Sequence, residues 1–275
     1  MANSQTPSLI VCGLEGVLAP GMGSASQSCD LTAAQLYSAV GGHLTIFTQR
    51  SPAAVRAALG GSAVNLPVAA CGGAVLYNLQ KDCLFQSRAI MALTGRELIR
   101  FAMDNLTHPG IIGVDELGRT RLLCASREAQ MVLNREGGAY DVLPMESAGD
   151  RWCKLVICAG GHQIEKIQEH LENNPDLPVS VMRQDAYSIE LVSSRVSPEE
   201  TMERLCALAG CEQQQTTAVV VQEYDLGWAQ YTGEIVALGD ASDEVKNSAQ
   251  KVLGTYRSGS MAEYLYGHAA AMQQL

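Results

Sequence analysis

The stretch LIVCGLEGVLAP, residues 9–20, decides the fold. Its apolar run is typical of a strand that is buried on both faces of a parallel sheet. The run ends at Gly13, and a single carboxylate, Glu15, precedes the turn residue Gly16. A strand that ends in an acidic residue and a glycine is typical of a site that handles phosphate groups. This one offers a single acid, with Gly13 where a second would be useful.

The composition is that of a folded protein that is not suited to nucleic acid or to a membrane. Among 275 residues, 47% are apolar and 17% are charged, as in ordinary globular chains. The net charge of −10 and the scattered lysines argue against nucleic acid, which requires clustered Lys and Arg. No apolar run approaches 18 residues, and the N-terminal residues lack the basic start of a signal peptide. The nine cysteines include no CxxC pair, so we expect reduced thiols in a cytoplasmic protein.

Strand and helix signals alternate after the first strand. Asp30 is expected to cap a helix over 30–40, and a helix over 51–61 has Ser51 as its N-cap and Gly60 at its end. This alternation predicts an α/β fold with a Rossmann-like core, a parallel sheet and right-handed crossovers. The strands of this part are expected over 8–14, 41–48 and 66–78.

A second α/β module interrupts this core from about residue 80. It carries its own helices and strands, from a helix over 92–106 to a strand pair over 178–192, and is expected to form an inserted cap. The core is therefore predicted to comprise residues 1–78 and 186–275, and the cap residues 79–185. The returning part of the core is expected to contain helices over 197–210 and 242–253 and strands over 216–221 and 234–238.

The order of these segments resembles a known family. The landmarks are LIVCGLEGVL, LTIFTQRS, VAACGGAVLYN and WCKLVI, followed by YSIELVSSRVSPEE and EIVALGDASDEVKNSAQKVL. Over nearly the whole chain they resemble the haloacid dehalogenase superfamily, and within it the Cof-type, subfamily IIB sugar phosphatases with a C2-type cap. The resemblance implies phosphoryl transfer through an aspartyl-phosphate. It implies an Asp nucleophile, an Asp acid/base, a Thr or Ser, a Lys and an acidic pair that binds Mg²⁺.

The first motif lacks the residue that would attack phosphorus. The resemblance places the nucleophile on Gly13, which has no side chain, and the acid/base on Glu15, whose carboxylate can still transfer a proton. Gly16 keeps the turn. Two interpretations of Glu15 stay open: it is a residual acid/base, or it is an exposed residue of a strand-end loop. Cys12 is interpreted as a buried strand residue and not as a nucleophile.

The next two motifs are kept only in part. Thr48 and Arg50 match the second motif and are candidates for binding an anion, although a Thr at a strand end is equally a turn residue. Gln49 stands between them, where the family usually has Gly. The lysine position falls on Pro198, which offers neither charge nor donor, and Arg195 is the nearby cation. The predicted ligand-binding residues are Gly16, Thr48, Arg50, Gly72 and Arg195.

Two segments compete for the position of the fourth motif. The segment LGDASD, which contains Asp240 and Asp243, looks like the metal-binding motif but matches a later family segment without a gap. Counting back places the motif on VVQEYD, so that one Mg²⁺ ligand becomes Val221 and another, Asp225, is retained. Asp225 is then either a residual metal ligand or a cap of the helix that follows. The alternative assigns the metal to Asp240 and Asp243.

Three functions follow from these motifs. The preferred one is a catalytically silent, phosphatase-like protein that binds a phosphorylated or anionic small molecule and needs no cofactor. The second is an active Mg²⁺-dependent hydrolase of sugar phosphates that uses Glu15, Asp240 and Asp243 in an unexpected geometry. The third is a structural or oligomerising module without a ligand. Losing a covalent nucleophile alone costs on the order of 10⁶ in turnover, which favours the first.

Overall fold

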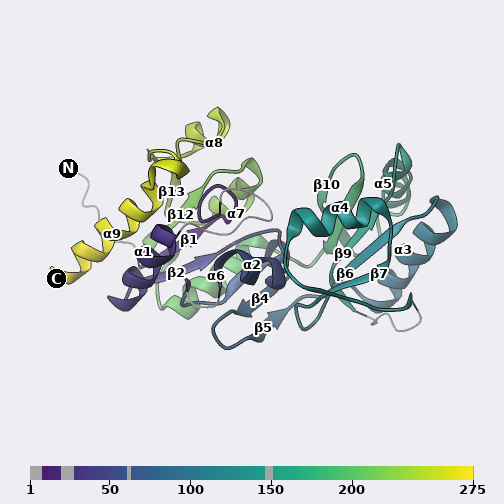
Figure 1. The fold of residues 1–275 in the computed structure, drawn as a ribbon, viewed down its shortest axis with the longest axis horizontal. Coiled ribbons are helices and arrows are strands. Elements are labelled where there is room, and N and C mark those ends of the chain that lie inside the picture. Colours follow the sequence, from purple (N-terminus) through teal and green to yellow (C-terminus); the bar gives the residue numbers. More distant parts are fainter. Residues whose placement is uncertain (1–7, 20–27, 61–62, 146–150, 275) are drawn as a thin grey trace.

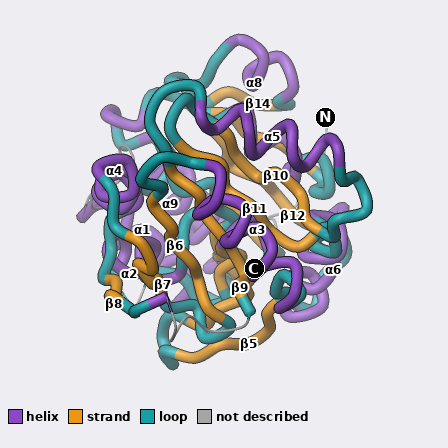
Figure 2. The backbone as a smooth tube through the Cα atoms, turned by 90° about the vertical axis from the view of Figure 1, so that its right-hand side faces the viewer, coloured by secondary structure: helices purple, strands orange, loops and turns teal. Residues whose placement is uncertain are grey.

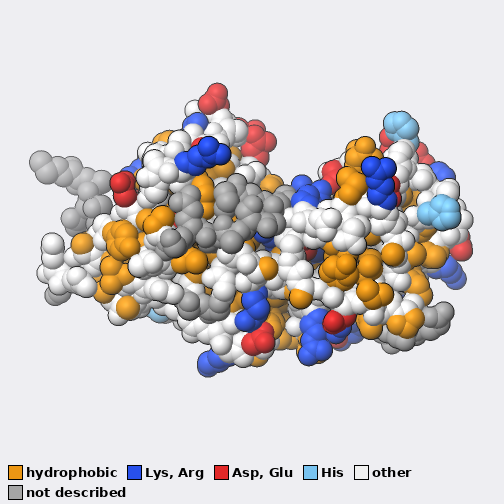
Figure 3. Space-filling model, viewed as in Figure 1, with side chains coloured by type: hydrophobic (Ala, Val, Ile, Leu, Met, Phe, Trp, Pro, Cys, Tyr) orange, Lys and Arg blue, Asp and Glu red, His pale blue; other side chains and the backbone are white. Residues whose placement is uncertain are grey.

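The computed structural model describes residues 8–19, 28–60, 63–145 and 151–274 (Figure 1). The chain forms two lobes that lie side by side, a core at the left of Figure 1 and a cap at the right. Figure 3 shows a notch between the two lobes, with Lys or Arg side chains beside it. In the described ranges, no helix combines the length and the hydrophobicity needed to cross a bilayer.

The core is built on a five-stranded sheet in which every pairing is parallel. The first strand, β1 (Leu9–Cys12), is fully buried and lies between β12 (Thr216–Val220) and β2 (His43–Ile46). β13 (Glu234–Ala237) and β14 (Lys251–Val252) extend the sheet beyond β12. Because ligands of open α/β sheets bind beyond the carboxyl ends of the strands, the loops after β1, β2 and β12 define the place for a site.

The core helices follow the predicted order. In α2 (Pro52–Leu59), the Ser51 hydroxyl accepts a hydrogen bond from the backbone N–H of Ala54 at 3.3 Å, and Gly60 ends the helix, so both predicted caps are confirmed. Asp30 does not cap α1, because this helix begins two residues earlier and Asp30 lies inside its first turn. The other core helices are α1 (Ser28–Ala39), α6 (Pro198–Ala209), α7 (Leu226–Ala229), α8 (Asp243–Ser248) and α9 (Ser260–Gln273).

Two expected core elements differ. The helix predicted over 242–253 ends early as α8, and its last residues form the edge strand β14. The third strand, β3 (Val68–Ala70), leaves the parallel sheet apart from one bridge between Phe47 and Ala69. It pairs antiparallel with β4 (Val75–Asn78), which pairs with β5 (Cys83–Ser87). Short 3₁₀ turns occupy Cys71–Gly73, Gln213–Gln215, Glu223–Asp225 and Tyr256–Ser258.

The cap is a six-stranded sheet of order β10-β11-β9-β6-β7-β8. Helices α3 and α5 cover one face, in front of the sheet in Figure 2, and α4 covers the other. The strand β6 was not predicted, because its flanking Pro and Gly residues resemble a loop. The cap elements are α3 (Ala92–Asn105), β6 (Gly110–Asp115), β7 (Thr120–Cys124), α4 (Arg127–Glu136), β8 (Tyr140–Val142), β9 (Trp152–Cys158), α5 (Gln163–Asn173), β10 (Val179–Gln184) and β11 (Ser188–Ser193).

The border between cap and core differs from the prediction. The expected border at residue 185 falls inside the hairpin of β10 and β11, and β11 lies between β10 and β9 in the cap sheet. β11 therefore belongs to the cap, and the chain returns to the core after it. The family resemblance placed the segment YSIELVSSRVSPEE at the return to the core, but its residues 188–193 belong to a strand that pairs with β9 in the cap.

Candidate active-site crevice

Asp225 fills the space in front of Gly13, directly after the strand β1. A Cβ atom placed on Gly13 would lie 2.5 Å from Oδ2 of Asp225 and 3.1 Å from its Cγ. Real Cβ atoms do not approach other heavy atoms this closely, so residue 13 cannot carry a side chain unless Asp225 moves. The two loops predicted to form the site, after β1 and after β12, therefore do meet, but a carboxyl from the second occupies the place of a side chain from the first.

Asp225 is held by protein donors, and its burial favours the protonated form. Its carboxyl is 1% exposed and accepts hydrogen bonds from the backbone N–H of Gln222 and from Nε1 of Trp228, each at 3.3 Å. Burial, followed by the charge of Glu15, raises the pKa of Asp225 from 3.8 to about 8. The Trp228 ring stacks on Phe47 with a centroid distance of 5.2 Å, which fixes the donor. The carboxyl does not cap the helix α7 that follows.

Val221 lies against the turn at Gly16. Gly16 has φ +78°, and a Cβ atom there would lie 2.9 Å from Cγ1 of Val221. The position predicted for a metal ligand thus carries an apolar side chain that packs on the turn of the first motif. Asp240 and Asp243 lie elsewhere, after the neighbouring strand β13: both are exposed, and Asp240 accepts a hydrogen bond from the backbone N–H of Tyr256.

The residues at these loops do not fit Mg²⁺. This ion requires six oxygen ligands in octahedral geometry, usually including one or two carboxylates. Gly13 and Val221 offer no side-chain oxygen, and the Asp225 carboxyl already accepts hydrogen bonds from Gln222 and Trp228. Among the described residues, no three His, Cys, Asp or Glu side chains group in a way that could hold a metal ion.

Glu15 and Arg50 form a buried ion pair on the core side of the crevice. Arg50 Nε donates to Oε1 of Glu15, and the Tyr224 hydroxyl donates to Oε2 at 3.2 Å. The interpretation of Glu15 as an exposed loop residue is wrong, because it is 5% exposed. Thr48 is buried as well, and its hydroxyl accepts from the backbone N–H of Arg50 at 3.2 Å, which fixes the start of the loop after β2.

The remaining predicted residues divide between the crevice and the outside. Gly72, at φ +65°, lies under the cap, since a Cβ atom there would lie 2.8 Å from Sδ of Met182. Pro198 is the first residue of α6. Arg195 is exposed, and its carbonyl accepts a hydrogen bond from Arg88 at 3.1 Å. Cys12 is fully buried in β1, and burial raises the pKa of its thiol, so it does not act as a nucleophile.

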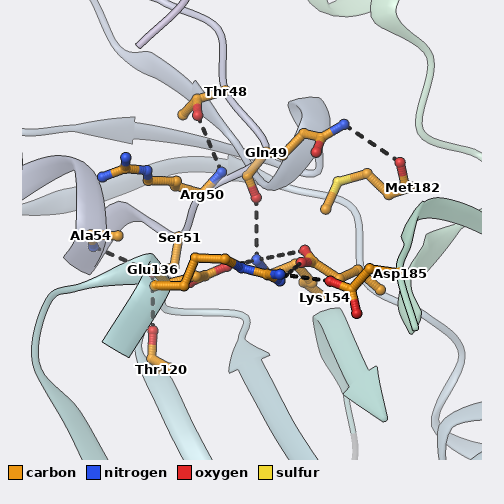
Figure 4. Close-up of polar contacts among 12 residues, drawn as sticks. Thr48, Gln49, Arg50, Ser51, Ala54, Thr120, Glu136, Lys154, Met182 and Asp185 are labelled. Atoms are coloured by element: carbon orange, nitrogen blue, oxygen red, sulfur yellow. Dashed lines mark hydrogen bonds and ion pairs between the residues drawn. The ribbon is translucent and has the colours of Figure 1, made fainter. Parts of the chain in front are cut away.

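The cap contributes a buried charge network that faces the core (Figure 4). Lys154, from β9, donates to Glu136, to Oε2 of Glu190 at 3.1 Å and to the carbonyl of Gln49 in the core at 3.2 Å. Arg135 adds ion pairs to Asp185 and Glu190. Burial lowers the pKa of Lys154, but the two glutamates outweigh this effect and raise it, so the amine stays charged.

This network was not predicted from the sequence. The signal was Lys154 itself, a lone cation inside the apolar run WCKLVIC, in which all seven residues are buried. A fully buried lysine requires a carboxylate partner. The sequence does not show which carboxylates reach Lys154, because Glu136 and Glu190 lie 18 and 36 positions away along the chain.

Little free space remains between the two lobes where Glu15 and Arg50 face the cap. The crevice holds a cavity of about 10 Å³, about what one water molecule needs. Three glutamates and three arginines line it, so its charges balance. The core provides Glu15, Gln49, Arg50 and Tyr224, and the cap provides Arg135, Glu136, Arg183 and Glu190.

Comparison with known proteins gives the family. The family of haloacid dehalogenase-like hydrolases matches residues 10–265. The chain belongs to this family. A haloacid dehalogenase-like hydrolase from Bacteroides thetaiotaomicron has a similar fold, with a TM-score of 0.81, 17% identity, and 94% of this chain and 98% of that chain covered.

Other solved structures share the fold. TM0651 from Thermotoga maritima has a TM-score of 0.79 and 16% identity, over 94% of this chain and 96% of that chain. The HAD subclass IIB sugar phosphatase BT4131 has a TM-score of 0.73 and 13% identity, over 94% of this chain and 99% of that chain. No curated protein matches the sequence. The predicted Rossmann-like core with an inserted α/β cap is confirmed.

Proposed function

We propose that this haloacid dehalogenase family protein is catalytically silent and binds a phosphorylated or otherwise anionic small molecule without a metal. The observation that carries the proposal is the distance of 2.5 Å between a Cβ atom on Gly13 and Oδ2 of Asp225. A nucleophilic aspartate does not fit there unless Asp225 moves, and the carboxyl that fills the space is hydrogen-bonded to Trp228.

Two further positions support catalytic silence. Val221 packs on Gly16 where a metal ligand is expected, and Pro198 supplies no charge where the family uses a lysine. Covalent attack, metal binding and charge neutralisation each need a group that is missing here. Such losses are not additive, but the first alone costs on the order of 10⁶ in turnover.

The cations of the crevice support an anionic ligand. Arg50, Arg135 and Arg183 line the same small cavity, together with the amide of Gln49 and the hydroxyl of Tyr224. Guanidinium groups bind phosphate and carboxylate through paired hydrogen bonds. The sugar phosphatase among the structural relatives acts on phosphorylated sugars, which makes sugar phosphates the first ligands to test.

Turnover assays test catalytic silence. We expect no hydrolysis of p-nitrophenyl phosphate or of sugar phosphates with Mg²⁺ by the unchanged protein. Mg²⁺-dependent turnover that Glu15→Ala abolishes would contradict the proposal. Gly13→Asp alone is expected to stay inactive, because Asp225 fills the space. The combined change Gly13→Asp, Val221→Asp and Pro198→Lys is the matched attempt to restore activity.

Thermal shifts test the ligand. A sugar phosphate that raises the melting temperature in the presence of a metal chelator would support metal-independent binding. No shift with any member of a metabolite panel, together with a stable dimer in solution, would support the structural module instead.

A further inference from the structure

The cation best placed to bind an anion, Arg50, already holds one. Its side chain is 3% exposed, and its Nε donates to a carboxylate oxygen of Glu15. The second oxygen of that carboxylate accepts from the hydroxyl of Tyr224. The Glu15 carboxylate therefore binds Arg50 in the way that a phosphate or a free carboxylate would. One of its oxygens accepts from Arg50, and the other accepts from a second donor.

The charge balance of the crevice opposes a second anion. Three glutamates face three arginines around a cavity of about 10 Å³. A phosphate that entered while every glutamate stayed in place would add unpaired negative charge to a buried space, where charge is costly. It would also find too little room. An anion can therefore reach Arg50 only if a carboxylate leaves.

The cap closes over this pair through the loop that follows Thr48. Nε2 of Gln49 donates to the carbonyl of Met182 at 3.4 Å, and the hydroxyl of Thr120 donates to that of Ser51 at 3.1 Å. Gly138, at φ +87°, lies against the backbone of Ala53, so closely that a Cβ atom would approach it to 2.7 Å. The residues after Thr48 thus bind the cap, and the cap covers Glu15 and Arg50.

We propose that Glu15 is an internal occupant of the anion site, so that an external oxyanion binds Arg50 only when Glu15 is displaced. This inference rests on the proposed function and adds its regulation. The side chain that the family resemblance marks as a residual acid/base acts here as a competitor of the ligand.

Rescue of a variant by inorganic phosphate tests the proposal. Glu15→Ala removes the competitor and leaves Arg50 buried beside an empty space. We expect this variant to melt at a lower temperature and phosphate to restore the loss. The half-maximal phosphate concentration should lie at least about tenfold below that of the unchanged protein, which corresponds to about 1.4 kcal/mol. Chloride at equal ionic strength should have no such effect, and Arg50→Ala added to Glu15→Ala should abolish the rescue.

Glu190→Ala is the matched control. It removes an equal charge from the other wall of the same crevice, but Lys154 keeps Glu136 and Arg135 keeps Asp185. We expect little rescue of this variant by phosphate. Equal rescue of both variants would show that net charge and not Arg50 governs binding, and would overturn the proposal.

The remaining outcomes separate this inference from the proposed function. Equal phosphate affinity of Glu15→Ala and the unchanged protein would overturn displacement of Glu15 while leaving metal-free anion binding in place. No phosphate response in either protein would overturn the inference, whereas catalytic silence is decided separately by turnover. If Glu15→Ala does not fold, Glu15→Gln removes the charge but still fills the space, so it should bind phosphate more tightly than the unchanged protein, and equal affinity would overturn the proposal.

Discussion

The two walls of the crevice differ in the buried charges that they carry. The core wall, where the family places its catalytic groups, carries Gly13 and Val221 and has one buried ion pair, Glu15 with Arg50. The cap wall carries a network centred on Lys154, with Glu136 and Glu190. A buried charge persists only where a partner is held close to it, and the buried charges of both walls have such partners.

The crevice is closed because its polar side chains are hydrogen-bonded to one another. A working site keeps unpaired groups ready for a ligand, at a cost in stability. Here the Asp225 carboxyl accepts hydrogen bonds from two protein donors, and the Glu15 carboxylate accepts from Arg50 and Tyr224. Each group that could have faced a ligand faces a protein group instead, which favours a closed, stable arrangement of core and cap.

Removing the central cation of the cap wall should have the largest effect on stability. Lys154→Met leaves Glu136 and Glu190 buried without their ammonium partner, so we expect a loss of about 3–5 kcal/mol in the free energy of unfolding, measured in urea. The control is Arg151→Met, whose ion pair with Glu116 is largely exposed and should be worth about 0–1 kcal/mol. Equal losses in the two variants would contradict the role of the network.

Adding a methyl group at Gly13 in the core wall should have the next largest effect on stability. Gly13→Ala places a methyl group against the Asp225 carboxyl, and we expect a loss of about 1–3 kcal/mol in the free energy of unfolding, as for other overpacked cores. Gly227→Ala, where a Cβ atom would meet no heavy atom within 4 Å, is the control and should be close to neutral. If Gly13→Ala were equally neutral, Asp225 would not be fixed in front of Gly13.

Per pH unit, the smallest expected change is in the pH dependence of stability. The pKa of Asp225 is raised by burial from 3.8 to about 8, so the folded protein binds a proton that the unfolded chain releases. Its stabilising contribution is fully present below about pH 4 and is lost as the pH rises to about 8, by at most about 1.4 kcal/mol per pH unit. Asp225→Asn should flatten the urea-unfolding free energy over this range, whereas the exposed Asp243→Asn should not. A profile that Asp225→Asn leaves unchanged would show that Asp225 is ionised.

Much of the fold could be predicted because local signals and the family pattern agree. Ser51 and Gly60 delimit α2 as expected, and the apolar run before Gly13 forms a fully buried strand of the parallel sheet. The errors lie where one local pattern fits two structures. The strand at 188–193 joins the cap and not the core, and the end of the last predicted helix pairs with β13 as a strand. Pairing partners are chosen by long-range packing, which a short apolar run does not specify.

The sequence by itself determined which chemical groups are missing: no side chain at Gly13, no charge at Pro198 and no ligand oxygen at Val221. Only the tertiary structure decided what took their place. Whether Glu15 would be exposed or paired depended on Arg50, which lies 35 positions away and reaches it across two adjacent strands. Asp225 fills the space before Gly13 for the same reason, since the sheet brings together loops that the chain keeps far apart. The sequence states which residue stands at each position, but the fold decides which partner a buried charge meets.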